Sequence, residues 1–258
     1  MRDTLGQIAQ MARRSILQTV RQPAMVIPPI VFPLLLVSIN SSGLSAATRI
    51  PGFPAKSYWD FAIAVPFIQG SLFAAINAGT AMARDVETGF IKRLAMTPMH
   101  RMALLIGQLI GVMTVAFVSA FIYIAAGFVA GMDFKAGALG IPAIILLGTL
   151  VALAFAGIGA YIGLRSGSGE AVQGIFPLLF VFLFLSSVNL PRNLIEQDWF
   201  RTIATYNPVS YLVEGVRSLI ITGWDTRALA LGFGFATLIA VISVSLAAGA
   251  LRTRLIRT

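Results

Sequence analysis

Hydrophobic positions in this chain follow one another in long blocks and do not alternate with polar ones. A helix needs about 20 mostly apolar residues to cross a hydrocarbon core about 30 Å thick, whereas a strand of a membrane barrel alternates over about 10 residues. Six stretches without Asp, Glu, Lys or Arg are long enough for such a helix: 22–48, 61–83, 102–132, 136–164, 171–191 and 228–251. The pattern predicts an all-α membrane protein with six transmembrane helices in a single transmembrane domain, 1–258. We expect the spans at about 23–42, 60–83, 102–130, 138–164, 171–190 and 228–251.

The residues before the first span have the period of an amphipathic helix. Ile8, Ala12 and Ile16 share one face, and Arg14 lies on the opposite one. This spacing predicts an N-terminal helix, 1–22, that lies on the membrane surface.

The first two spans carry residues that predict how they pack. Pro28, Pro29 and Pro33 free backbone carbonyls in the first span, and a membrane helix tolerates this where neighbouring helices supply the donors. The second span has small residues at the spacing that lets helix backbones approach closely: Gly70, Ser71, Ala74, Ala75, Ala78 and Gly79.

The segment 191–222, before the last span, is of a different kind. It mixes short apolar pieces with proline, tryptophan, tyrosine and charge, and its longest uncharged run, between Arg201 and Glu214, is too short to cross a membrane. We expect an outer re-entrant helical hairpin there, covered by protein because irregular backbone is not exposed to lipid.

The charge of the chain indicates its orientation. Charged residues make up only 11% of the sequence, against about 25% in soluble domains. Of the 19 Lys and Arg residues, 12 fall in the segments that six spans place on the same side as both termini. By the positive-inside rule the termini are cytoplasmic. The net charge of +9 is thus explained by topology, and we expect no nucleic acid partner.

The residues that catalysis requires are scarce. The chain has one histidine, His100, and no cysteine, which excludes disulfides and thiolate metal sites. No Gly-Lys dipeptide occurs, so a phosphate-binding loop of the GxxxxGK type is absent. The predicted spans also lack the charged groups of proton-driven transporters. These features leave a channel, a scaffold, or a transporter driven by a separate protein.

The loop after the second span, RDVETGFIKRLAMTP at 84–98, reads as a short amphipathic helix. Phe90 and Leu94 can face the membrane part, while Lys92 and Arg93 face water. The loop resembles the signature of ABC-2-type permeases, in which an acidic pair precedes Gly, a helix with Leu, and Thr-Pro.

A second segment, YNPVSY at 206–211, is similar to the motif that the same family carries before its last span. The order of these elements along the chain resembles short drug-exporter permeases of the daunorubicin-resistance type. Two departures are Phe90, where the family often has Thr, and an acidic pair made of Asp85 and Glu87 instead of two glutamates.

The resemblance implies a permease subunit of an ATP-driven exporter in the inner membrane of a bacterium, with a hydrophobic or amphiphilic, drug-like or lipid-like substrate. Its expected partners are an ATP-binding-cassette nucleotide-binding subunit, a second permease copy or homologue, and membrane lipid. ATP and Mg would bind to the partner subunit, so we expect no cofactor, no catalytic residue and no metal site in this chain.

The expected functional residues form three groups. Coupling to the ATPase would use a coupling helix, 84–98, with Asp85, Glu87, Gly89, Arg93, Thr97 and Pro98. A substrate path would use Phe67, Phe73, Asn77, Phe176, Phe180 and Phe184. An outer gate would use Tyr206, Asn207, Pro208, Tyr211 and Glu214.

Three alternatives stay open at this point. A polysaccharide or glycolipid exporter has the same architecture with a wider channel. An ATP-independent channel would conduct without a motor subunit, and a membrane scaffold would show neither flux nor ATP coupling.

Overall fold

The computed structural model describes residues 2–97 and 100–256, and all of the regular structure in these residues is helical. The bounds of the long helices are α1 Arg2–Val20, α2 Pro23–Gly43, α4 Ala64–Glu87, α6 Arg101–Val129, α7 Gly137–Ser166 and α12 Thr226–Ile256. The shorter ones are η1 Ser45–Arg49, α3 Tyr58–Ala62, α5 Phe90–Ala95, α8 Gly169–Gly174, α9 Phe176–Phe184, η2 Arg192–Leu194, α10 Asp198–Tyr206 and α11 Pro208–Ile221. The predicted all-α class is confirmed.

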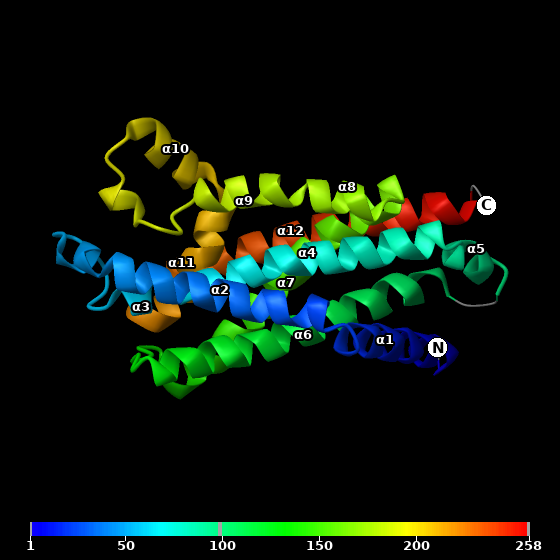
Figure 1. Ribbon diagram of the computed structural model, residues 1–258, viewed down its shortest axis with the longest axis horizontal. Coiled ribbons are helices and arrows are strands. Elements are labelled where there is room, and N and C mark those ends of the chain that lie inside the picture. Colours follow the sequence, from blue (N-terminus) through cyan, green and yellow to red (C-terminus); the bar gives the residue numbers. More distant parts are fainter. Residues whose placement is uncertain (1, 98–99, 257–258) are drawn as a thin grey trace.

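The long helices run side by side between two ends of an elongated bundle (Figure 1). One end holds both chain termini and α5, and we call it the terminal end. The opposite end holds α3 and α10, and we call it the distal end. The start of α1 and the end of α12 therefore lie at the same end of the bundle.

Among the described residues, five helical stretches are long and apolar enough to cross a membrane: α2, α3 with α4, α6, α7 and α12. The span expected at 171–190 differs, because it is divided into α8 and α9. Pro177, in the first turn of α9, has no N–H for the helix ladder, and its ring disfavours a helical residue before it. Together α8 and α9 cover 16 residues, or about 24 Å of helix, which is less than the core thickness of about 30 Å.

Helix α4 lies at the centre of the bundle, and its backbone nearly touches that of α7. A Cβ atom at Gly159 of α7 would lie 1.8 Å from the carbonyl oxygen of Ala75. One at Gly163 would lie 2.1 Å from the oxygen of Gly79. The prediction that small residues in the second span permit close packing is therefore confirmed at Ala75 and Gly79.

The prolines of α2 free two carbonyls that neighbouring helices satisfy. Pro29 has no N–H for the oxygen of Met25, and the side-chain amide of Asn77 on α4 donates to that oxygen at 3.0 Å. Pro33 likewise leaves the oxygen of Pro29 free, and the hydroxyl of Tyr123 on α6 donates to it. The expected compensation is confirmed, and it joins α2 to α4 and α6.

Helix α1 packs on the first half of α6 through small residues. A Cβ atom at Gly107 would lie 2.3 Å from that of Met11, and one at Gly111 would lie 2.0 Å from the hydroxyl of Ser15. The larger apolar residues Leu5 and Val20 stay exposed. Helix α1 therefore packs Met11 and Ser15 against the glycines of α6 and leaves Leu5 and Val20 exposed.

The contact between α4 and α7 gives a first prediction. Replacing Gly159→Ala should destabilise the folded protein by about 1–3 kcal/mol, because the new methyl group would push the two backbones apart. The measurement is thermal unfolding in mild detergent. Gly249→Ala on α12 is the control, because nothing lies within 4 Å of its added methyl group. Equal unfolding temperatures for the two variants would contradict the close contact.

Candidate functional site

The predicted coupling segment begins as the last turn of α4 and continues as a separate short helix. Helix α4 ends at Glu87, and Gly89 then adopts a left-handed conformation with φ +67°. Such a conformation strains residues that carry a Cβ atom, so glycine suits this bend. Helix α5 starts at Phe90. The single helix expected over 84–98 is thus divided at Gly89.

Helix α5 is amphipathic in the way that its sequence indicates. Phe90 and Leu94 are partly buried against the core between α4, α6, α7 and α12, and Ile91 is only 3% exposed. Lys92 and Arg93 are exposed on the other side. The buried Ile91 was not among the expected contact residues, although its position between Phe90 and Leu94 could have indicated it.

Asp85 is engaged within the chain and does not face solvent. Two oxygens of its carboxylate accept hydrogen bonds from Arg14 of α1, at 2.7 and 3.3 Å. The Arg14 guanidinium also lies 4.1 Å from the centre of the Phe90 ring, within the range of a cation–π contact. Arg14 therefore joins α1 to both α4 and α5. The sequence placed Arg14 on the polar face of α1 but did not indicate this partner.

The other coupling residues make local contacts. One carboxylate oxygen of Glu87 accepts a hydrogen bond of 3.3 Å from the backbone N–H of Gly169, at the start of α8. Arg93 donates to the backbone oxygen of Thr88 at 3.0 Å, and the Thr97 hydroxyl donates to that of Leu94 at 2.8 Å. Pro98 lies outside the described residues. Glu87 and Arg93 are both exposed, so a partner protein can reach them.

Four of the six expected substrate-path residues lie together along one side of the bundle. The rings of Phe176, Phe180 and Phe184 follow one another on α9, with centres 4.8 and 5.9 Å apart. Phe73 of α4 adjoins Phe176 at 5.5 Å. Phe32 of α2, which was not predicted, lies within 6.3 Å of both Phe73 and Phe180. We call these five residues the aromatic row.

Phe67 and Asn77 lie elsewhere, on the wall of a cavity of about 480 Å³ that is lined by α1, α2, α4 and α6 with parts of α5 and α7. The Phe67 ring is 5.3 Å from that of Tyr123 and packs over Gly148. Asn77 uses its amide N–H for the carbonyl of Met25, so its position has a structural reason. The expected substrate path is therefore divided between two places.

The Asn-Pro motif joins α9, α10 and α11 at the distal end. The side-chain oxygen of Asn207 accepts a hydrogen bond of 2.9 Å from the N–H of Val209 and so caps α11. Its side-chain nitrogen donates to the oxygens of Phe182 and Leu185, at 2.7 and 3.1 Å. Pro208 occupies the first turn of α11, where no partner for an N–H is needed. Asn207 thus begins one helix and closes the end of another.

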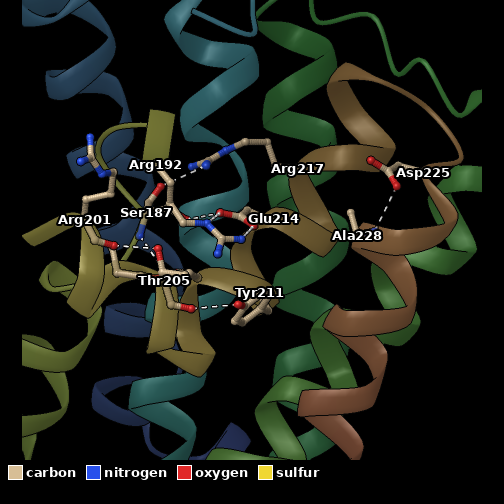
Figure 2. A network of polar contacts seen from close by, with 11 residues as sticks. Ser187, Arg192, Arg201, Thr205, Tyr211, Glu214, Arg217, Asp225 and Ala228 are labelled. Carbon is tan, nitrogen blue, oxygen red and sulfur yellow. Dashed lines mark hydrogen bonds and ion pairs between the residues drawn. The ribbon is translucent and has the colours of Figure 1, made fainter. Parts of the chain in front are cut away.

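Arg217 of α11 is buried beneath the irregular chain that follows α9. Its guanidinium donates three hydrogen bonds of 3.0 Å to the backbone oxygens of Phe61, Ser187 and Val188. Figure 2 shows Arg217 beside Ser187 and Glu214. The three carbonyls belong to no continuous helix ladder. One side chain therefore supplies the donors for three carbonyl oxygens that lack a backbone partner. The sequence analysis did not predict this role for Arg217.

Glu214 accepts hydrogen bonds from Arg192 and from the hydroxyl of Ser187 (Figure 2). Partial burial acts to lower the pKa of Arg192, but the hydrogen bonds and charges of Glu214 and Tyr211 outweigh it and raise that pKa above its ordinary value. Arg192 therefore keeps its charge, and its pair with Glu214 holds the chain after α9 against α11.

The two expected gate tyrosines differ in their surroundings. Tyr206 ends α10 and is 82% exposed. The Tyr211 hydroxyl donates to the backbone oxygen of Thr205 at 2.8 Å, and its ring stacks on Phe235 with centres 4.8 Å apart. Tyr211 thus fixes the turn between α10 and α11, while the Tyr206 side chain is exposed.

The sequence is similar to a known family of membrane proteins. The family model for the ABC-2 type transporter matches residues 6–221, which include both motifs. A putative transport permease, ycf38, of Porphyra purpurea is 26% identical over 227 residues, which cover 86% of this chain and 77% of the relative. A probable doxorubicin resistance ABC transporter permease protein, DrrC, of Mycobacterium tuberculosis is 24% identical over 156 residues, 60% of this chain and 55% of the relative. The resemblance inferred from the motifs is confirmed, and the chain belongs to the ABC-2 type transporter family.

Proposed function

We propose that this multi-pass membrane protein is the permease subunit of an exporter that moves hydrophobic or amphiphilic molecules out of the cell. The family works with an ATP-binding subunit, and we assign ATP and Mg to that subunit. The permease would work as a dimer, with a second copy or a homologous chain, in the cytoplasmic membrane. The relative whose name gives doxorubicin resistance supports a drug-like substrate.

The observation that carries this proposal is the construction of α5 at the terminal end. Its apolar side is buried in the core, while Lys92 and Arg93 are exposed and Met96 is 89% exposed. A short helix with one anchored side and one free cationic side suits docking of a soluble subunit. Apolar exposure at Met96 supports the same function, because interfaces are enriched in methionine.

Movement of α5 would reach several long helices at once. The helix follows α4 directly, packs on α12, and contacts Arg14 of α1. Arg254 of α12 in turn donates to the backbone oxygens of Leu164 and Arg165 at the end of α7, at 2.8 and 2.9 Å. A displacement of α5 by the ATP-binding subunit would therefore move these helix ends together.

The sixth pass through the membrane would be made by α8 and α9 with the chain that follows. The helix pair begins beside Glu87 at the terminal end and finishes at Asn207 at the distal end. Its irregular end is covered by α11, as backbone at membrane depth requires. Six passes keep both termini on one side, and the positive-inside rule assigns that side to the cytoplasm.

The aromatic row is the surface we propose for substrate contact. Its rings come from α2, α4 and α9, and Phe184 is 49% exposed, so a second permease copy could face them. Flat aromatic faces suit amphiphilic molecules with little charge. The distal helices α10 and α11 would lie beside the exit.

The proposed docking site predicts a loss of partner binding in Arg93→Glu. Reversing this exposed charge should weaken co-purification of the ATP-binding subunit by about tenfold, which equals about 1.4 kcal/mol. The tagged permease would be isolated from its host in mild detergent, and the accompanying ATPase identified by mass spectrometry. Loss of ATPase activity in the isolated complex should follow.

Arg227→Glu is the matched control, because Arg227 is also exposed but lies at the distal end, at the start of α12. It should retain the ATPase and the activity of the unaltered complex. Two results would overturn the proposal: recovery of no ATPase with a folded permease, or equal ATPase recovery with Arg93→Glu and Arg227→Glu.

The aromatic row predicts altered substrate selection in Phe180→Ala. Removing the ring at the centre of the row should lower transport of some amphiphiles severalfold in reconstituted vesicles, while assembly with the ATPase is unchanged. Phe121→Ala on α6 is the control, since Phe121 is exposed and pairs with Phe117 away from the row. Identical transport by both variants across a substrate panel would remove the aromatic row from the transport path.

A further inference from the structure

The cavity beside α4 has the size and shape of a ligand site. Its volume of about 480 Å³ falls within the range of about 300–1,000 Å³ that is usual for small-molecule pockets. It extends along α4 from Phe67 to Arg84, which a rise of 1.5 Å per residue converts to about 25 Å. The space is therefore long and narrow, and it reaches from the middle of the bundle to the terminal end.

The two ends of this cavity differ in polarity. The deep end is lined by Pro29, Phe67, Ala74 and Tyr123, which offer aromatic and aliphatic surface. Asn77 and Thr80 of α4 line the cavity between these two ends. The hydrogen bonds of Asn77 and Tyr123 to the carbonyls of α2 keep their donors away from the cavity. Ser71 and Ser119 add two hydroxyls to this aromatic and aliphatic wall.

The end near α5 carries positive charge. Arg14, Arg84 and Arg93 line it together with a single carboxylate, that of Asp85. Asp85 is bound to Arg14, so its charge is neutralised. Within the described residues the side chain of Arg84 makes no ion pair, and that of Arg93 donates only to the backbone oxygen of Thr88. Two guanidinium groups are therefore available at the rim, and guanidinium is well suited to phosphate and carboxylate groups.

We propose that this cavity binds a single-chain amphiphile with an anionic head group, the tail lying along α4 toward Phe67 and the head group contacting Arg84 and Arg93. This site lies inside one permease chain and is separate from the aromatic row. It does not depend on the exporter function proposed above. A head group at this rim lies next to Arg14, which also contacts Asp85 and Phe90. The bound molecule would therefore lie beside the contacts that join α1 to α5.

The absence of cysteine from the sequence makes a direct test possible. Ala81→Cys places a unique thiol on the cavity wall. The permease alone, without ATPase, would be placed in phosphatidylcholine nanodiscs and labelled with methyl methanethiosulfonate. Palmitoyl lysophosphatidic acid at four times its Kd should slow the labelling about fivefold, from the factor 1 + [L]/Kd. Arg84→Gln in the same background should weaken that protection by about tenfold in Kd.

The controls separate the head group, the tail and the bilayer. Monopalmitin has the same tail without phosphate and should protect less than lysophosphatidic acid, as should inorganic phosphate alone. Ala248→Cys, on α12 and outside the cavity, should label at the same rate with and without the probes. The proposal is overturned by absent protection at Ala81→Cys, by equal protection from either partial probe, or by equal slowing at Ala248→Cys. Because no ATPase is present, failure here leaves the exporter proposal standing.

Discussion

The near contact between the backbones of α4 and α7 is the constraint on which the rest of the structure depends. Lipid tails are as apolar as leucine, so membrane helices associate through close packing and hydrogen bonds and gain little from apolar burial alone. Gly159 and Gly163 permit this contact because they carry no side chain where Ala75 and Gly79 approach. Helix α4 thereby becomes the fixed centre, and the proline-bearing α2, the Arg14 contact and α5 are all attached to it.

Charged side chains at the distal end and on α5 have different surroundings. At the distal end Arg217 satisfies carbonyl oxygens of chain that no helix ladder covers, and Glu214 pairs with Arg192 beside it. These charges hold irregular backbone in place. At the terminal end Lys92 and Arg93 stay exposed on a helix whose other face is buried. Arg217 and Glu214 are thus satisfied within the chain, whereas α5 presents its charge outward.

Parts of the functional sites could be read from local sequence alone. Gly89 as a bend, and Phe90 and Leu94 as the buried side of α5, follow from residue type and helical period. The partners of Asp85 and Arg217 could not be read in this way, because they lie 71 and at least 29 positions away. Likewise, the sequence indicated Asn77 as a substrate contact. In the structure its side-chain amide donates to the carbonyl oxygen of Met25, which Pro29 leaves without a helical donor.

By itself the sequence determined that the chain is helical and lies in a membrane, because uncharged length alone decides whether a helix can cross lipid. It also determined the family, through two short motifs. Only the tertiary structure decided that the phenylalanines separate into a row and a cavity wall, and that arginines from α1, α4 and α5 meet at one rim. Those outcomes depend on which helix faces pack together, and the periodicity of a single helix carries no information about its neighbours.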